Sequence, residues 1–445
     1  MKLLRGAVGV VVALLALASR ADELTLRQAT GEALHKNPGL RMAAARQNAA
    51  AGGLAEARSY WLPRIDVSET AMRSNNPVFV FGSLLEQGRF GPANFDPRFL
   101  NNPDPLRNYR LGLNVRFTVF DQLRRFDSMR QASNSVAQAK AGTDETQQAT
   151  RLDVLAKFYG LLVEEARRDV AVEAVRSAEA DASAMREKLR QGLLVESDAL
   201  SAEVQLASFR QQQIEAEGGV RVARAALNTT IGRDALAETS ARGELPKAIR
   251  EEAPLEELFR RGLAARGELH AAKLGTDNAR LRLQMARGSL LPRLDTFASW
   301  GASGPSIGDR NSDHAIGAIV SFDVFDGSKF ARIAQARAGA EEANAAQSAA
   351  RDKVSMEIIG AYERVRSARE RIHVAEIAAE QAASAARIVR DRYEQGLTTI
   401  TEQLRAQTAL VTARLNLLSA RYDYVIGSAD LARSTGGLHD VDLFE

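Results

Sequence analysis

The side chains that could carry out chemistry in this 445-residue chain follow no catalytic or metal-binding pattern. There is no cysteine, which excludes disulfides, thiolate metal sites and a cysteine nucleophile. No histidine lies within four residues of another, so no paired HExxH-type metal site is present. The sequence also has no P-loop, GxGxxG motif or serine nucleophile elbow. We therefore expect no enzymatic activity, no catalytic residues, no cofactor and no bound metal.

The first 21 residues have the pattern of a secretory signal peptide. Lys2 and Arg5 give a positively charged start, and the 13-residue apolar run over 6–18 that follows is too short to span a bilayer. Ser-Arg-Ala at 19–21 offers a cleavage site, with Ala-Leu-Ala at 16–18 as the alternative. Removing the three bases of this segment from the total of 59 leaves 56 basic and 56 acidic residues in a chain that starts at Asp22. The mature chain is then neutral, which argues against nucleic-acid binding. Without cysteine, it has no site for an N-terminal lipid.

Three short motifs occur twice in the same order. They are Leu-Pro-Arg-Ile-Asp at 62–66 and Leu-Pro-Arg-Leu-Asp at 291–295, Val-Phe-Asp at 119–121 and 324–326, and Gln-Gly-Leu at 191–193 and 395–397. The offset falls from 229 to 205 to 204 residues, which indicates a tandem duplication with 24 extra residues in one loop of the first half. A repeat this long is not a solenoid unit. We expect a signal peptide at 1–21, repeats at 22–232 and 254–436, a linker at 233–253 and a tail at 437–445.

Each half is expected to contain two strands with a two-residue period. Apolar and polar residues alternate most regularly over 109–120, and the other strands are expected at about 65–73, 294–300 and 314–325, with loops at 73–108 and 301–313. A strand of 12 residues with this alternation is long enough for the wall of a transmembrane β-barrel. Four strands cannot close such a barrel, since bacterial single-chain barrels start at about eight. Three copies of the chain would supply twelve.

Long helices make up most of the rest. Residues 126–190 and 330–393 contain no proline, and at ~1.5 Å per residue the first would be a rod of roughly 98 Å. Return helices are expected at 197–229 and 401–433, and residues 255–291 are expected to be helical. Asn37 and Pro38 should separate two helices near the start of the chain. The fold class is thus mainly α with a small transmembrane β part. A plain periplasmic coiled-coil scaffold without a pore is the alternative.

The chain resembles the TolC family of outer-membrane efflux proteins over nearly all of its mature length. The resemblance rests on the duplication, the Phe-Asp turn from strand to long helix, and the segment that begins Arg-Tyr-Glu-Gln-Gly-Leu at 392–397. It implies a homotrimer with a 12-stranded β-barrel in outer-membrane lipid and a 12-helix α-barrel across the periplasm. It also implies a passive exit duct that meets a periplasmic adaptor (membrane fusion) protein and, indirectly, an inner-membrane pump of the RND or ABC type.

The resemblance further implies a gate at the periplasmic end. Tyr393 matches the family's gate tyrosine, Glu402 falls at an acidic gate position, and Asp198 is its counterpart in the first half. Thr398 stands where the prototype has arginine, and Arg405 replaces a second aspartate, so the closing links should differ here. Asp198 could instead be a helix N-cap, and Glu402 a first-turn carboxylate that the helix dipole favours.

The helix-tip turns are the expected contacts for the adaptor. They comprise Gln191, Gly192 and Leu193 in the first half and Gln395, Gly396 and Leu397 in the second. The glycines are expected to serve the turns rather than to bind a ligand. An exit duct for type I protein secretion has the same fold and is the alternative within transport. The walls of such ducts look alike, so the sequence does not identify the cargo.

Overall fold

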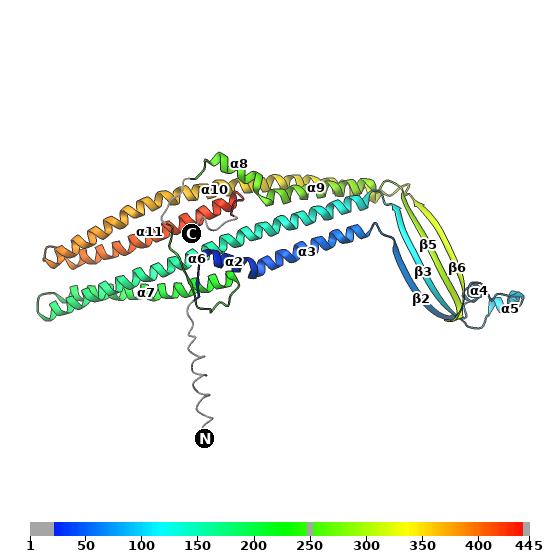
Figure 1. The fold of residues 1–445 in the computed structure, drawn as a ribbon, viewed down its shortest axis with the longest axis horizontal. Helices are drawn as coiled ribbons and strands as arrows, with labels where there is room; N and C mark the ends of the chain where they lie inside the picture. The colour runs from blue at the N-terminus through cyan, green and yellow to red at the C-terminus, as the bar shows by residue number, and fades with distance from the viewer. Residues whose placement is uncertain (1–21, 247–251, 439–445) are drawn as a thin grey trace, which may run out of the picture. The chain divides into compact units, whose positions relative to one another are not determined.

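The computed structural model describes residues 22–246 and 252–438, which divide into two units (Figure 1). One unit contains the chain up to residue 46, residues 140–271 and the residues from 348 onward. The other contains 47–139 and 272–347. The expected signal peptide at 1–21 lies outside the described residues, as do 247–251 of the expected linker and 439–445 of the tail.

The second unit is built on a four-stranded antiparallel sheet in the order β2-β3-β5-β6. The strands are β2 (Arg64–Ser74), β3 (Leu106–Phe120), β5 (Arg293–Ser306) and β6 (Asp309–Ser321). Each half of the duplication contributes one pair of neighbours, and pairing of β3 with β5 joins the halves, for example where Leu113 faces Trp300.

The sheet has one apolar and one polar face because its register aligns the alternating patterns of all four strands. Val67, Leu113 and Trp300 are aligned across β2, β3 and β5. The neighbouring row, which points to the opposite face, aligns Asp66, Asn114 and Ser299. The apolar side chains are uncovered in the single chain: Val67 is 70 % exposed, and Ile316 of β6 is 84 % exposed. Within the described residues, β2 and β6 each have one long unpaired edge.

The expected loop at 301–313 is wrong. β5 continues to Ser306 and β6 begins at Asp309, so only two residues connect them. A Cβ atom at Gly301 would lie 2.6 Å from the Arg110 guanidinium, and one at Gly304 would lie 1.7 Å from the carbonyl oxygen of Asp309. These glycines allow close approach inside a hairpin, which the sequence alone does not distinguish from a flexible loop. β6 also ends before 322–325, which the prediction had included.

The expected loop at 73–108 is also corrected. It contains α4 (Pro77–Glu86), a 3₁₀ helix η1 (Pro92–Phe95) and α5 (Pro97–Asn101), and β3 already begins at residue 106. Asn76 caps α4 and Asp96 caps α5 through side-chain bonds to backbone N–H groups. Pro77, Pro92 and Pro97 occupy first helical positions, where the missing N–H costs nothing.

The first unit is helical. The first half contributes α2 (Leu26–Lys36), α3 (Pro38–Ser59), α6 (Arg124–Arg190) and α7 (Glu196–Ile231), and the second α8 (Leu255–Ala265), α9 (Gly267–Gly288), α10 (Gly327–Glu394) and α11 (Ile400–Ser434). Parts of α3, α6, α9 and α10 belong to the other unit. The helical stretch expected over 255–291 ends at Gly288 and is divided in two, because Arg266 adopts an extended conformation between α8 and α9. A parallel pair of short strands, β1 (Asp22–Leu24) and β4 (Thr239–Ala241), was not predicted.

No helix among the described residues has both the length and the apolar character that crossing a membrane requires.

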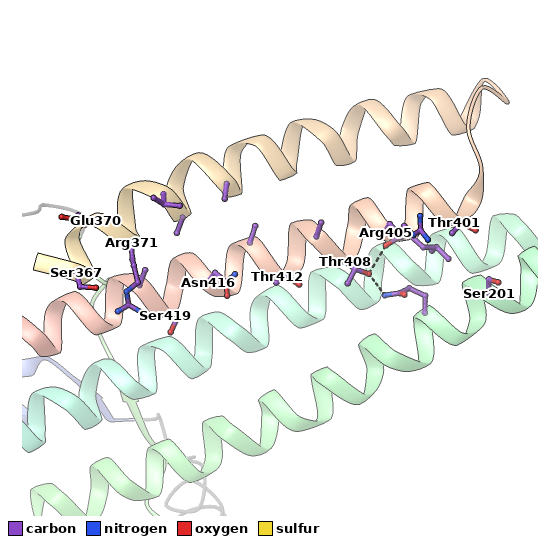
Figure 2. Close-up of a pocket in the computed structure, with 18 residues that line it drawn as sticks. Ser201, Ser367, Glu370, Arg371, Thr401, Arg405, Thr408, Thr412, Asn416 and Ser419 are labelled. Atoms are coloured by element: carbon purple, nitrogen blue, oxygen red, sulfur yellow. Dashed lines mark hydrogen bonds between the residues drawn. The ribbon is translucent and has the colours of Figure 1, made fainter. Parts of the chain in front are cut away.

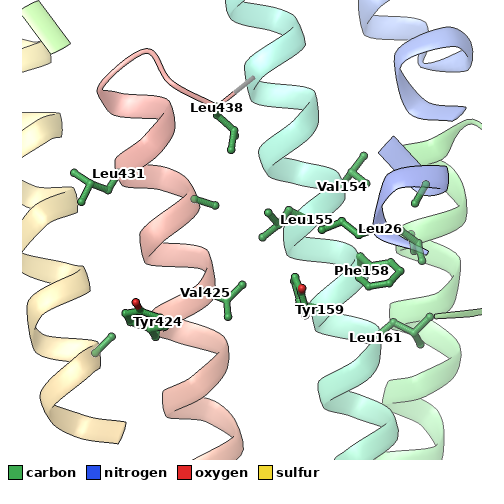
Figure 3. Packing of buried hydrophobic residues seen from close by; sticks show 14 of the residues in the cluster. Leu26, Val154, Leu155, Phe158, Tyr159, Leu161, Tyr424, Val425, Leu431 and Leu438 are labelled. Atoms are coloured by element: carbon green, nitrogen blue, oxygen red, sulfur yellow. The ribbon is translucent and has the colours of Figure 1, made fainter. Parts of the chain in front are cut away.

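The main core of the helical unit joins the two halves of the duplication (Figure 3). Leu155 and Phe158 of α6 are buried with Leu26 of α2, and Val425 and Leu431 of α11 belong to the same cluster. Burial of each such side chain stabilises the fold by about 1.5–3 kcal/mol. The core therefore fixes α11 of the second half against α6 of the first.

Candidate gate at the helix tips

The turn from α6 to α7 is a Schellman motif. Gly192 has a φ of 72°, and its N–H donates to the Leu189 carbonyl at 2.9 Å. The Leu193 N–H donates to the Lys188 carbonyl at 2.9 Å, which completes the pattern. The expected tip residues of the first half therefore lie in a compact turn that satisfies the carbonyl groups at the helix end.

The turn from α10 to α11 repeats this geometry. Gly396 has a φ of 74°, its N–H donates to the Tyr393 carbonyl at 3.0 Å, and the Leu397 N–H donates to the Arg392 carbonyl at 2.8 Å. Gln191 and Gln395, one residue before each glycine, both donate their N–H groups to carbonyls four residues earlier. The sequence repeat thus corresponds to a repeat of backbone hydrogen bonds.

Both tips present an exposed leucine. Leu193 is 71 % exposed and Leu397 is 62 % exposed. Each follows the left-handed glycine directly, where the Schellman motif usually packs its apolar residue against the helix. Apolar side chains held outward on rigid turns are suited to contact with another protein.

Behind the first tip, α6 and α7 pack as a coiled coil. The buried positions of α6 include Val175, Ala178, Ala182 and Met185, and those of α7 are Ala199, Ala202, Leu206 and Phe209. Both sets follow the alternating three- and four-residue spacing of a heptad pattern. The small alanines allow the helices to approach closely, so the tip turn is held on a rigid hairpin.

Tyr393 lies in the last turn of α10 and reaches α6 of the first half. Its hydroxyl donates to the Met185 sulfur at 3.0 Å, and the Lys188 ammonium lies 4.9 Å from its ring centre. Burial raises the pKa of Tyr393 above its ordinary value, and the nearby charges of Asp198 and Asp181 raise it further. The tyrosine therefore stays protonated and can serve as a hydrogen-bond donor between the halves.

The structure does not join the other expected gate residues to Tyr393 by hydrogen bonds in the described part of the chain. Asp198 is half-buried in the first turn of α7. It is not the N-cap, because the helix begins at Glu196 with Val195 in that position. Glu402 lies in the first turn of α11 and pairs with Arg405 on the same helix at 3.1 Å, with both side chains more than half exposed.

Sequence reasoning missed a group of polar residues beside this tyrosine. Asp181 of α6 accepts a hydrogen bond from the Gln403 amide at 3.1 Å and another from the Gln407 amide. Gln403 and Gln407 are 3 % and 8 % exposed. The signal was present, since they lie three and seven residues after the buried Ile400, where a helix would normally place apolar side chains.

A groove of about 1130 Å³ runs along α10 and α11 beside α7 (Figure 2). Hydroxyl and amide groups dominate its polar lining, including Ser201, Ser367, Thr401, Thr408, Thr412, Asn416 and Ser419. The Gln205 amide of α7 donates to the Thr408 hydroxyl of α11 at 3.3 Å across it. The rest of the lining consists of alanines, Val374 and Leu404, together with the charged residues Glu370, Arg371 and Arg405.

The chain matches the outer membrane efflux protein family over residues 29–233 and 258–437. It belongs to this family, whose members are outer-membrane channel proteins, and the chain is an outer-membrane efflux channel. The two matched segments correspond to the two halves of the duplication.

Two curated relatives and one solved structure illustrate the likeness. Protein CyaE of Bordetella pertussis is 26 % identical over 422 residues, which cover 93 % of this chain and 83 % of CyaE. The alkaline protease secretion protein AprF of Pseudomonas aeruginosa is 23 % identical over 76 % of this chain and 71 % of AprF. The CmeC outer membrane channel of Campylobacter jejuni shares the fold with a TM-score of 0.82, at 18 % identity over 93 % of this chain and 86 % of that one.

Proposed function

We propose that three copies of the chain assemble into a homotrimeric duct whose sheets close a 12-stranded barrel in the outer membrane. The observation that carries this proposal is the four-stranded sheet, with its uncovered apolar face and the unpaired edges of β2 and β6. Unpaired edges and exposed apolar faces are unfavourable in a single chain in water. Pairing β6 of one copy with β2 of the next satisfies both edges, and lipid covers the apolar face.

The long helices of the three copies would form a 12-helix α-barrel across the periplasm. Cargo then diffuses through a continuous water-filled path, and an inner-membrane pump supplies the energy. The exposed leucines at the tips, Leu193 and Leu397, support docking of a periplasmic adaptor at this end. The turns from Gln191 and Gln395 onward present these leucines in the same backbone geometry.

The gate would lie at the same tips. Tyr393 supports this assignment because its hydroxyl reaches from the second half to Met185 of the first, close enough to Asp198 for that charge to raise its pKa. Glu402 and Arg405 pair with each other at the start of α11, where a partner's charged group could displace the pairing. Movement of α10 and α11 away from α6 and α7 would open the pore.

Conductance across a planar lipid bilayer tests the duct. The purified, detergent-solubilised oligomer should insert and give uniform current steps. The double variant Tyr393→Phe with Asp198→Ala should raise the conductance of each step, because it removes the hydroxyl and the charge at the tip. A protein that never gives steps contradicts the channel. Wild-type steps in the double variant contradict the role of these two residues.

Protein secretion is the second candidate, favoured by the relatives. AprF is described as a protease secretion protein, and its match covers 76 % of this chain. The chain would then export polypeptides delivered by an ABC-type pump. Expression in a strain that lacks its own exit ducts separates the two: restored release of a secreted polypeptide supports secretion, and restored resistance to small toxic compounds supports efflux.

A further inference from the structure

A three-residue link joins the two halves of the chain about two to three helical turns behind the tips. The carboxylate of Asp181 on α6 receives the Nε2 groups of Gln403 and Gln407 on α11, one on each oxygen. The distance from Gln403 Nε2 to Asp181 Oδ1 is 3.1 Å. Hydrogen bonds to an ionised acceptor are stronger than those between neutral groups. We call Asp181, Gln403 and Gln407 the α6–α11 clasp.

A neighbouring contact ties α10 to the same place. The guanidinium of Arg390 on α10 donates to the Ser177 hydroxyl on α6 at 3.0 Å, and Gln407 Nε2 lies 3.4 Å from the same hydroxyl. Both helices of the second half therefore meet α6 within one turn. Arg390 is exposed whereas the glutamines are buried, so the clasp is the better protected of these links.

The clasp places two polar side chains at buried positions of α11, where apolar side chains are usual. Gln403 and Gln407 occupy the face of α11 that begins with the buried Ile400, where apolar residues would stabilise the closed arrangement more. Their Oε1 atoms are buried and meet no protein donor among the described residues. A buried amide oxygen without a donor costs free energy that is recovered when the site opens to water.

The hydrogen bonds to Asp181 and the unpaired amide oxygens have opposite effects on the contact between α6 and α11. The charge-assisted bonds favour contact between α6 and α11, while the two unpaired amide oxygens favour separation. An arrangement of this kind closes specifically yet stays close in free energy to the open form, as a two-state element must if a partner is to shift it. An all-apolar seam would close more tightly and respond less to a docked adaptor.

We infer that the α6–α11 clasp, with Asp181 as its central acceptor, is a second link that holds the periplasmic gate closed in this chain, beside Tyr393 at the tip. This inference rests on the proposed function as a gated duct. Asp181 acts as a positioning residue: it holds α11 against the first half and does not contact cargo. The clasp acts together with Tyr393 at the tip, whose hydroxyl bonds to Met185 of α6.

An exchange of the partners tests the pairing. Asp181→Asn removes the charge, and Gln407→Glu places a second carboxylate against the first. Each single variant should raise the fraction of time that single channels spend open in a bilayer by about ten-fold, with the larger effect for Gln407→Glu. The combined variant Asp181→Asn with Gln407→Glu restores one carboxylate facing one amide, and it should return the open fraction toward the wild-type value.

The matched control lies two residues before the clasp. Glu179 is an exposed carboxylate on α6 whose partner, Arg210, is on α7 of the same half, at 2.7 Å. Glu179→Gln therefore removes the same charge without touching the contact between halves and should leave the open fraction unchanged. Single variants that match wild type, or a combined variant that stays open, overturn the clasp. A wild-type protein that gives no channels at all overturns the duct itself, so the two failures are distinguishable.

A cross-link provides a second readout if a substitution prevents assembly. The chain has no cysteine, so D181C together with Q407C introduces the only thiols. Oxidation to a disulfide should hold the channel in its low-conductance state, and a reductant should open it. Channels that open equally in both redox states would contradict the assignment of this contact to the gate.

Discussion

Asn37 and Arg266 occupy equivalent positions in the two halves, 229 residues apart, and each interrupts a helix. Their backbones are nearly the same, with φ and ψ of −61° and 126° at Asn37 and −69° and 117° at Arg266. The side chains differ. Asn37 donates to the Thr230 carbonyl at 3.0 Å, whereas Arg266, whose side chain is 2 % exposed, lies 2.9 Å from Glu357 and 3.1 Å from Glu268. The same backbone conformation is thus accompanied by a hydrogen bond to a carbonyl in the first half and by ion pairs in the second.

Replacing Arg266 should lower the free energy of unfolding much more than replacing an exposed arginine. Arg266→Met removes the buried cation between Glu268 and Glu357 and leaves them, among the described ion pairs, only the exposed ammonium of Lys353. Loss of one member of a buried ion pair typically costs about 3–5 kcal/mol, and the loss here should approach that range. Arg280→Met is the control, because Arg280 is 61 % exposed and pairs only with Asp277 on its own helix turn among the described ion pairs. Chemical unfolding of the detergent-solubilised protein measures both. Equal losses would contradict the account of the buried pair.

Acid should weaken the contact between α2 and the end of α7. The hydrogen bond from Arg233 lowers the pKa of Glu32 from 4.5 to about 2. A carboxyl with a depressed pKa adds stability that is fully present above its unfolded value and is lost as pH falls toward its folded value. The stabilisation should therefore decline between about pH 4.5 and 2.

Glu32→Gln should remove this pH dependence and cost about 2 kcal/mol at neutral pH, as expected for a hydrogen bond to a charged group. Unfolding measured across the acid range checks it. Arg64 and Asp66, an ion pair with both side chains at least 36 % exposed, are the comparison, and Asp66→Asn should change the acid profile little. A variant at position 32 with the wild-type acid profile would refute the assignment.

Replacing either tip glycine should destabilise the protein even though a Cβ atom there would meet no neighbouring atom. No atom lies within 4 Å of a Cβ built at Gly192 or Gly396, but both have a positive φ. Alanine there should cost about 1–2 kcal/mol from backbone strain alone. Gly339→Ala inside α10 also meets open space, and it should instead stabilise by about 0.5–1 kcal/mol. In unfolding experiments, the change in the free energy of unfolding should be negative for the tip variants and positive for Gly339→Ala. Changes of the same sign would contradict the left-handed turn.

The exposed tip leucines should affect partner binding without affecting stability. Leu193→Ser and Leu397→Ser remove apolar surface that already faces water, so unfolding should change by less than about 0.5 kcal/mol. Affinity for the adaptor that we propose to dock at the tips should fall by about 1–3 kcal/mol for each, as for an apolar contact at an interface centre. Calorimetric titration with the adaptor measures this, and Leu236→Ser, at an 89 % exposed position away from the tips, is the control. Unchanged affinity would place the docking surface elsewhere.

Regular patterns in the sequence predicted much of this fold. The alternation over 109–120 lies within β3, and the long proline-free stretches correspond to α6 and α10. Such features follow from local periodicity, so no knowledge of distant contacts was needed. The break at Asn37 followed in the same way from the proline after it.

The errors arose where a residue's role depends on a neighbour distant in sequence. Gly301 and Gly304 indicated a loop but lie in a tight hairpin, and the buried Arg266 pairs with Glu357 of α10, 91 residues away. Gln403 and Gln407 looked like ordinary polar residues of a helix. Their partner, Asp181, is more than 220 residues away in the other half, and only tertiary structure brings it to them.

The oligomeric state of the conducting protein tests the central claim most directly. The four-stranded sheet cannot close by itself, so the account requires three copies in every conducting particle. Native mass spectrometry of the detergent-solubilised fraction that gives bilayer current should show three mature chains and no smaller active species. A monomer or dimer that conducts would contradict the account, because one or two sheets supply only four or eight of the twelve strands.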